Sequence, residues 1–164
     1  SVDLPQMIEL RKELLPASDR IQMLGQSALD HSWMDRVDSS RGVFITAEGL
    51  LMYLQPGESL GLIAECAKRF PSGQMMFDLP PAWAARLTGR GHRTSRRYRV
   101  PPMPFSLSRA EADNLVHTIP GVVAVHHVPM TTPRGVVLGT LAGAVNRSRR
   151  LADLSPVQLL LEFG

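Results

Sequence analysis

The stretch GVFITAEGLLMYL, Gly42 to Leu54, holds a polar pair, Glu48-Gly49, inside an otherwise apolar run. Val43 to Ala47 is β-branched and aromatic, which is typical of a buried strand, whereas Leu50 to Leu54 is unbranched and predicts the start of a helical segment. Glu48 is therefore expected where a strand ends. In an open parallel sheet, ligands bind beyond the carboxyl ends of the strands, so this carboxylate is placed for ligand binding. The alternative is that Glu48 only caps backbone donors of the next segment.

The composition indicates one globular domain. The chain has 164 residues, of which 44% are apolar and 20% charged. It has no run of roughly 18 uncharged apolar residues, and SVDLPQMIELRK lacks the order of a signal peptide, so we expect a cytoplasmic protein with no membrane segment. The lone Cys66 lies among helix-spaced apolar residues, which predicts a packed thiol.

Strands and helices are expected to alternate in the first half of the chain. We predict a short entering strand, a helix over 5–15 that begins at Pro5, a strand within 20–29, the strand Val43 to Ala47, a helix over 57–70 and a strand over 74–79. The buried face of the 57–70 helix is expected to comprise Leu60, Ile63, Ala64, Ala67 and Phe70. This alternation predicts an α/β sheet.

The second half changes character, since residues 82–105 are rich in Arg, Pro and Gly. We predict a helical turn over 83–87 and then a long loop. Ser108 with Glu111 has a capping-box spacing, which predicts a helix start. Beyond it we expect a strand over 121–130, a helix over 135–145 and a final strand over 156–163. The chain is then one domain with three parts: the cofactor side 1–80, an Arg/Pro-rich loop or substrate-side insert 81–107, and a C-terminal part 108–164.

Polar groups follow three predicted strands: Asp3 the first, Ser27 to Asp30 the second, and Glu48-Gly49 the third. If these strands are parallel neighbours, the three groups face one crevice. A carboxylate there can accept hydrogen bonds from vicinal ribose hydroxyls, and short side chains beside it leave room for an adenine ring. The spacing therefore predicts a site for a nucleoside-bearing cofactor.

Four segments in order, VDLPQMIELRKELLP, LGQSALDHSWMDRV, VFITAEGLLMYL and MMFDLPPAWAARL, resemble motifs of the leucine carboxyl methyltransferase family, and most closely its bacterial branch that acts in polyketide synthesis. The likeness implies a Rossmann-like class I methyltransferase sheet and S-adenosylmethionine as cofactor. It also implies that Asp3 binds the ribose, that Ser27 and Ala28 lie beside the adenine, and that Glu48 and Gly49 line the site near the methionine part.

The Gly-rich loop of that family, with the strand before it, has no counterpart here, because Gly89 and Gly91 follow no predicted strand. We therefore expect an incomplete sheet in a truncated enzyme that binds the cofactor poorly by itself. The open alternatives are a chain completed by an N-terminal segment or by oligomerisation, and a non-catalytic remnant.

The resemblance implies methyl transfer to a hydroxyl or carboxyl oxygen of a small, polyketide-like molecule. Alignment of donor and acceptor does most of the work in such a step. No general base stands out: Tyr53, His92 and Tyr98 are candidates, each with a structural role as the alternative. Tyr53, Trp83 and Arg86 are the candidates for the substrate side, and Trp83 is expected either as a packing residue or as a lid over the substrate.

An Arg-rich segment supports the rival hypothesis of a module that binds nucleic acid or an acidic partner. It contains Arg86, Arg90, Arg93, Arg96, Arg97 and Arg99, with Tyr98 among them. Such a segment could contact phosphates, recognise an acidic substrate or be a solvated loop. Because no basic stripe elsewhere matches it, we expect no nucleic-acid partner. His126 and His127 are adjacent on a predicted strand, so their side chains point to opposite faces and cannot share a metal ion.

Overall fold

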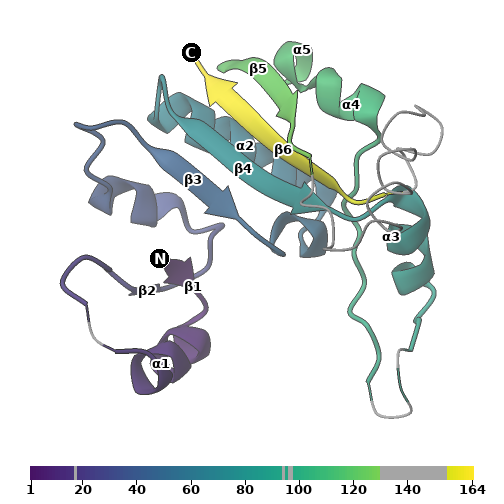
Figure 1. The fold of residues 1–164 in the computed structure, drawn as a ribbon, viewed down its shortest axis with the longest axis horizontal. Coiled ribbons are helices and arrows are strands. Elements are labelled where there is room, and N and C mark those ends of the chain that lie inside the picture. Colours follow the sequence, from purple (N-terminus) through teal and green to yellow (C-terminus); the bar gives the residue numbers. More distant parts are fainter. Residues whose placement is uncertain (17, 94, 96–97, 130–154) are drawn as a thin grey trace, which may run out of the picture. The chain divides into compact units, whose positions relative to one another are not determined.

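Two compact units, Ser1–Arg41 and Gly42–Gly164, make up the chain in the computed structural model (Figure 1). The structure describes residues 1–16, 18–93, 95, 98–129 and 155–164. The helix predicted over 135–145, together with Arg96 and Arg97, lies outside these residues. Each unit is described by itself below.

The first unit is built on a parallel strand pair. It contains β1 (Val2–Asp3), α1 (Pro5–Leu14), β2 (Leu24–Gly25) and the 3₁₀ helix η1 (His31–Arg36). Strands β1 and β2 pair in parallel, with Asp3 opposite Gly25. Helix α1 begins at Pro5 as predicted, because proline has no N–H to leave unpaired in the first turn.

The strand predicted within 20–29 is only two residues long, and the cause is local polar chemistry after Gly25. The Ser27 hydroxyl accepts a hydrogen bond from the Leu29 N–H at 3.2 Å, and the Asp30 N–H donates to the Ser27 carbonyl at 3.1 Å. Asp30 then caps η1 by accepting from the Ser32 N–H at 3.1 Å. Side chains that bond to nearby backbone compete with a strand ladder, so the chain turns early.

The second unit contains a four-stranded mixed sheet of order β3-β4-β6-β5. Its strands are β3 (Phe44–Ala47), β4 (Gln74–Leu79), β5 (Val122–His127) and β6 (Val157–Phe163). Strands β3 and β4 are parallel, whereas β6 runs antiparallel to both β4 and β5. Ala47 pairs with Phe77, so β3 and β4 end at almost the same level. The predicted α/β class is confirmed.

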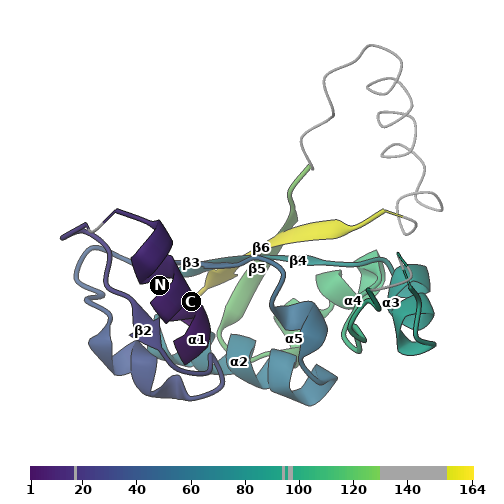
Figure 2. The same ribbon diagram turned by 90° about the horizontal axis from the view of Figure 1, so that it is seen from below.

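Helix α2 (Pro56–Arg69) covers one face of this sheet, together with α4 (Arg109–Asp113) and α5 (Leu115–Thr118) (Figure 2). Gln55 and Glu58 form a capping box at its start. The predicted face was wrong in part: Leu60 and Ala64 are only half-buried. The buried helix positions are Ser59, Leu62, Ile63, Cys66 and Ala67. The buried face of α2 includes Ser59, because its hydroxyl donates a hydrogen bond to the Leu51 carbonyl in the interior.

Strand β3 is where predicted, but the prediction that it is buried was wrong. Phe44 is 57% exposed, Thr46 is exposed, and only Ala47 is fully buried. Within the described residues β3 pairs with β4 alone. The side chains of a strand with one neighbour are flanked by other side chains on one side only. This accounts for the exposure of a β-branched, aromatic sequence.

The remaining predictions for the second half agree with the structure where it describes the chain. The turn over 83–87 lies within α3 (Ala82–Gly89), and Ser108 with Glu111 forms the predicted capping box at the start of α4. Strand β6 alternates buried and half-buried residues and supplies Leu159, Leu161 and Phe163 to the core.

Candidate functional site

The turn after β3 is tied to the end of β4 by a charged hydrogen bond. The Gly49 N–H donates to Oδ1 of Asp78 at 2.7 Å, across two parallel strands. Gly49 has φ +60°, a left-handed conformation that glycine adopts without strain. Glu48 is exposed and makes no hydrogen bond or ion pair within the described residues. The structure therefore holds the turn at one point and leaves the Glu48 carboxylate available to a ligand.

Two further bonds hold the chain just after this turn. Residues Leu51–Tyr53 form the 3₁₀ helix η2, as the unbranched sequence predicted. The Ser59 hydroxyl donates to the Leu51 carbonyl at 3.0 Å in a fully buried position, and the Phe105 N–H donates to the Met52 carbonyl at 3.4 Å. Tyr53 stays 44% exposed on this fixed segment.

The predicted ribose contact, Asp3, lies in the first unit at the carboxyl end of β1. Its Oδ1 accepts from the Leu4 N–H at 2.8 Å, and its Oδ2 is 4.0 Å from the guanidinium of Arg11. An ion pair this long and this exposed contributes little. Since a carboxylate has about four acceptor positions, Asp3 keeps capacity for two hydroxyl donors, so it fits the ribose of a nucleoside cofactor.

The predicted adenine contacts lie near Asp3. The Gln26 N–H donates to the Asp3 carbonyl at 2.9 Å, which continues the β1–β2 pairing and leads directly into Ser27. Ser27 and Ala28 form the turn that follows, and the Trp33 indole donates to the Ala28 carbonyl at 3.0 Å. The structure thus brings Asp3, Ser27 and Ala28 to the carboxyl end of one parallel strand pair. The premise that all three strands are parallel neighbours was wrong within the described residues, because β3, which leads to Glu48, pairs with β4 in the other sheet.

The substrate-side candidates Trp83 and Arg86 lie on α3 in the second unit. Trp83 is 49% exposed, and the Arg86 Nε–H donates to the Ala82 carbonyl of its own helix at 3.2 Å. Buried Thr88 links this helix to the segment 101–105, which we call the strap, because its hydroxyl accepts from the Met103 N–H at 3.1 Å. The strap also carries Phe105, so it connects α3 to η2.

The described parts of the Arg-rich segment, residues 92–93 and 98–100, pair with each other between α3 and the strap. Arg93 and Arg99 face each other in an antiparallel bridge, and the Val100 N–H donates to the His92 carbonyl at 3.0 Å. We call the described residues 90–93 and 98–100 the basic hairpin. No Asp or Glu occurs between Asp78 and Glu111, whereas this interval holds seven arginines. The described arginines of the hairpin, Arg90, Arg93 and Arg99, are all exposed.

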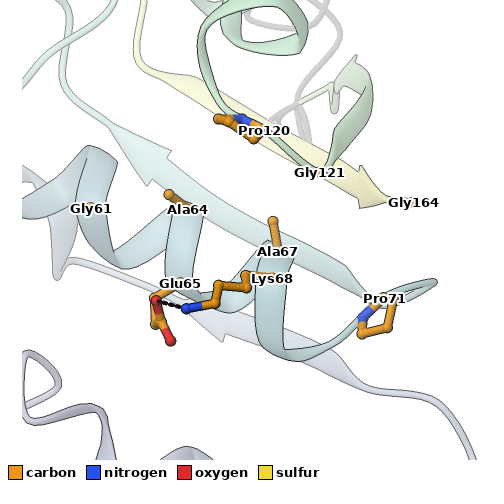
Figure 3. Close-up of a pocket in the computed structure, with 9 residues that line it drawn as sticks. All are labelled: Gly61, Ala64, Glu65, Ala67, Lys68, Pro71, Pro120, Gly121 and Gly164. Carbon is orange, nitrogen blue, oxygen red and sulfur yellow. Dashed lines mark ion pairs between the residues drawn. The ribbon is translucent and has the colours of Figure 1, made fainter.

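A hollow of about 400 Å³ lies at the other end of β4 (Figure 3). It is lined by Gly61, Ala64, Glu65, Ala67, Lys68, Pro71, Pro120, Gly121 and Gly164. Pro71 precedes β4, whereas Asp78 lies near its end, so the hollow and the Glu48 turn lie at opposite ends of the strand. None of the predicted site residues lines the hollow, and its only ion pair of described residues, Glu65 with Lys68 at 3.6 Å, lies along α2.

Other chemistry is sparse in the part of the chain that the structure describes. His126 contacts Glu162 at 3.2 Å and His127 contacts Asp113 at 2.8 Å, so the two rings point to opposite faces as predicted. In these ranges no three His, Cys, Asp or Glu side chains are grouped so that they could bind a metal ion, and no helix is long and apolar enough to cross a membrane.

Asp78 was missed by the sequence analysis, although the signal that identified Glu48 also applies to it. It is a carboxylate at the end of an apolar strand, in QMMFDLPP, directly beside β3.

Comparisons with known proteins show what the chain is related to. No family model matches it. It is 30% identical over 121 residues to the tetracenomycin polyketide synthesis O-methyltransferase TcmP of Streptomyces glaucescens, a match covering 74% of this chain and 43% of that protein. The chain thus spans less than half the length of this curated relative.

Solved structures show the fold. A DUF574 family protein from Streptomyces avermitilis has a TM-score of 0.61 at 19% identity, covering 99% of this chain and 64% of its own. A putative methyltransferase from Thermobifida fusca has a TM-score of 0.55 at 14% identity, covering 99% and 61%. An O-methyltransferase family protein from Burkholderia thailandensis has a TM-score of 0.52 at 16% identity, covering 99% and 42%. The chain is therefore a homologue of part of the tetracenomycin O-methyltransferase and has the class I methyltransferase-like fold that the resemblance implied.

Proposed function

We propose that this chain is part of an S-adenosylmethionine-dependent O-methyltransferase that acts on a hydroxyl or carboxyl group of a small, polyketide-like molecule. The observation that carries the proposal is the 30% identity over 121 residues to an enzyme named for O-methylation in polyketide synthesis. A small-molecule partner and a cytoplasmic location belong to the same proposal.

The cofactor contacts are proposed on the residues described above. Asp3 accepts hydrogen bonds from the ribose hydroxyls, and Ser27 and Ala28 lie beside the adenine. Glu48 and Gly49 contact the methionine part, where an exposed carboxylate suits the positive charge of an amino group or a sulfonium. These assignments are supported by the acceptor capacity left on Asp3 and by the exposure of Glu48.

The bound cofactor supplies an activated methyl group on its sulfonium. The protein's task is then to orient the two reactants, for which good alignment can lower the barrier by about 7 to 11 kcal/mol. A carboxylate acceptor needs no general base, and none is assigned to a residue. On the substrate side, exposed Trp83 offers an apolar surface. Arg86 has guanidinium N–H groups left for an anionic oxygen, since among the described residues only its Nε–H has a hydrogen-bond partner. Tyr53 provides a hydroxyl on the fixed segment η2.

Calorimetry on the complete protein encoded by its reading frame tests the proposal. Wild type should bind S-adenosylmethionine, and Glu48→Gln should weaken that binding by about tenfold, which corresponds to ~1.4 kcal/mol. Asp38→Asn is a matched control, because Asp38 is an exposed carboxylate that accepts a hydrogen bond from the Ser40 N–H. It belongs neither to the proposed cofactor contacts nor to the proposed substrate contacts. Equal affinity of wild type and Glu48→Gln would remove Glu48 from the site. Absence of binding by wild type would end the proposal itself.

A further inference from the structure

We infer that Asp78 is a positioning residue of the proposed cofactor site, acting through the Gly49 N–H to set the orientation of Glu48. The inference rests on the proposed function, and it assigns a role to a side chain that is not among the predicted site residues. Asp78 does not itself have to touch the cofactor for this role.

The argument begins with the end of the β3–β4 ladder. The register runs from Phe44 opposite Gln74 to Ala47 opposite Phe77, and no ladder pair follows. The Gly49 N–H therefore lies beyond the last paired residue of β3 and has no strand partner. Asp78 is the next residue along β4, and its carboxylate supplies the acceptor that the ladder no longer provides, at 2.7 Å. A hydrogen bond to a charged acceptor is roughly twice as strong as a neutral one.

The position of Asp78 in β4 makes the contact specific. Its neighbours Phe77 and Leu79 are both 1% exposed and point into the core, whereas Asp78 is half-buried on the other face of the strand. On the side of β4 away from β3, the Asp78 backbone pairs with Gln158 of β6. A carboxylate on a strand that pairs with β3 up to Phe77 and with β6 at Asp78 itself is a rigid anchor for a flexible glycine turn.

The other anchors of this region act further along the chain. Ser59 holds Leu51 and the strap residue Phe105 holds Met52, both after the turn. Within the described residues, Asp78 is the only side chain that bonds to Glu48 or Gly49. Removal of its carboxylate should therefore free the Glu48 side of the turn while η2 stays in place.

The test compares Asp78→Ala, Asp78→Ser and Asp78→Asn in the complete protein, with S-adenosylmethionine as the probe and Asp38→Ala as the matched control. Ala and Ser lack an acceptor that reaches Gly49, so the affinity for S-adenosylmethionine should fall by about tenfold, with the KM for the cofactor rising to match. Asn keeps the oxygen in place, so it should restore affinity to within about threefold of wild type. The KM for the methyl acceptor and kcat at saturating cofactor should stay unchanged. A general loss of structure would instead change these two constants together with the affinity for S-adenosylmethionine.

Amide exchange on the 164-residue chain gives a readout that needs no cofactor. The Gly49 N–H should exchange faster in Asp78→Ala and Asp78→Ser than in wild type, while the Leu51–Tyr53 amides keep their rates. If wild type binds S-adenosylmethionine and both short variants bind it within twofold of wild type, the inference is overturned. If wild type does not bind it, the proposed function fails and the positioning role fails with it, whereas the exchange rates still report whether the Asp78 bond exists. Ser is included because it keeps the position polar if Ala impairs folding.

Discussion

At the scale of single residues, Cys66 is the side chain whose environment the sequence predicted most fully. It is 1% exposed inside α2, and burial, with a smaller contribution from Glu65, raises the pKa of its thiol from 9.0 to about 12. A buried thiol that stays protonated is a poor nucleophile.

We expect native Cys66 to resist alkylation by iodoacetamide at pH 8, whereas unfolding in urea should expose it and allow rapid labelling. Because the pKa is higher in the folded than in the unfolded state, the unfolded state loses its proton first. Stability should therefore be fully present below about pH 9 and fall as pH rises toward 12. Mass spectrometry of the labelled chain measures the first effect. Cys66→Ala serves as the control for the second, since an unchanged pH slope in this variant would exclude the thiol as its cause.

The capping box at the start of α4 gives a second prediction for single residues. Glu111 accepts from the Ser108 N–H at 2.8 Å, and hydrogen bonds from the Ser108 side chain and backbone lower the pKa of the Glu111 carboxyl below its ordinary 4.5. A lowered pKa in the folded state means that the stabilisation is present above about pH 4.5 and is lost as pH falls below it.

Ser108→Ala should cost about 0.5 to 2 kcal/mol of unfolding free energy at pH 7, because it removes the N-cap. Glu111→Gln should flatten the loss of stability between about pH 5 and pH 3, since its amide does not titrate. Urea denaturation at several pH values measures both. The same acid dependence in wild type and Glu111→Gln would assign that dependence to other carboxylates.

At the scale of elements, the strap shows how one hydroxyl can connect two candidate regions. Thr88 donates to the Ala85 carbonyl at 2.8 Å and accepts from the Met103 N–H at 3.1 Å, so both hydrogen-bonding functions of its hydroxyl are used. Thr88→Val keeps the shape but leaves the Met103 N–H without this partner, at a cost of about 1 to 3 kcal/mol. Thermal or urea unfolding measures the loss. Thr118→Val is a matched control, because the Thr118 hydroxyl bonds only within its own helical turn and is exposed. Equal stability of Thr88→Val and wild type would mean that the strap is held by Phe105 instead.

The elements that the sequence predicted well are those specified by neighbours along the chain. The start of α1 follows from Pro5, the start of α4 follows from Ser108 and Glu111, and β4 follows from an unbroken apolar run. The errors arise where distant segments decide. Nothing near Phe44 in the sequence reveals that β3 has one strand neighbour, and the burial of Ser59 depends on an acceptor eight residues away.

The candidate site also has a part that the sequence could predict and a part that it could not. The position of Glu48 and Gly49 at a strand end could be predicted because strand-ending polar residues are visible in a single segment. The bond from Gly49 to Asp78 could not, since it joins positions 29 residues apart and depends on the register of two strands. The roles of Ser27, Tyr53, Trp83 and Arg86 stay predictions, because a role in binding depends on a ligand and not on the local sequence pattern.

At the scale of the whole molecule, the distribution of charge matters more than its sum. The formal net charge is only +3, yet seven arginines lie in the interval without acids that contains the basic hairpin, and the rest of the chain has more acidic than basic residues. The chain should bind heparin at low ionic strength and be released as salt shortens the range of electrostatic attraction to a few ångströms near 1 M. The triple variant Arg90→Gln, Arg93→Gln and Arg99→Gln should elute at lower salt, whereas Arg20→Gln, Arg36→Gln and Arg41→Gln should elute close to wild type. Equal elution of the two variants would show that retention follows net charge.

Strand β3 also has a practical consequence for handling the protein. Its backbone groups on the side away from β4 have no ladder partner in the described residues, and Phe44 is exposed beside them. Such an edge is a template on which a strand of another molecule can add, so we expect intermolecular β-aggregation in concentrated samples of this chain. A lysine in place of exposed Thr46 would act as a gatekeeper, and light scattering at rising concentration would reveal the protection it gives.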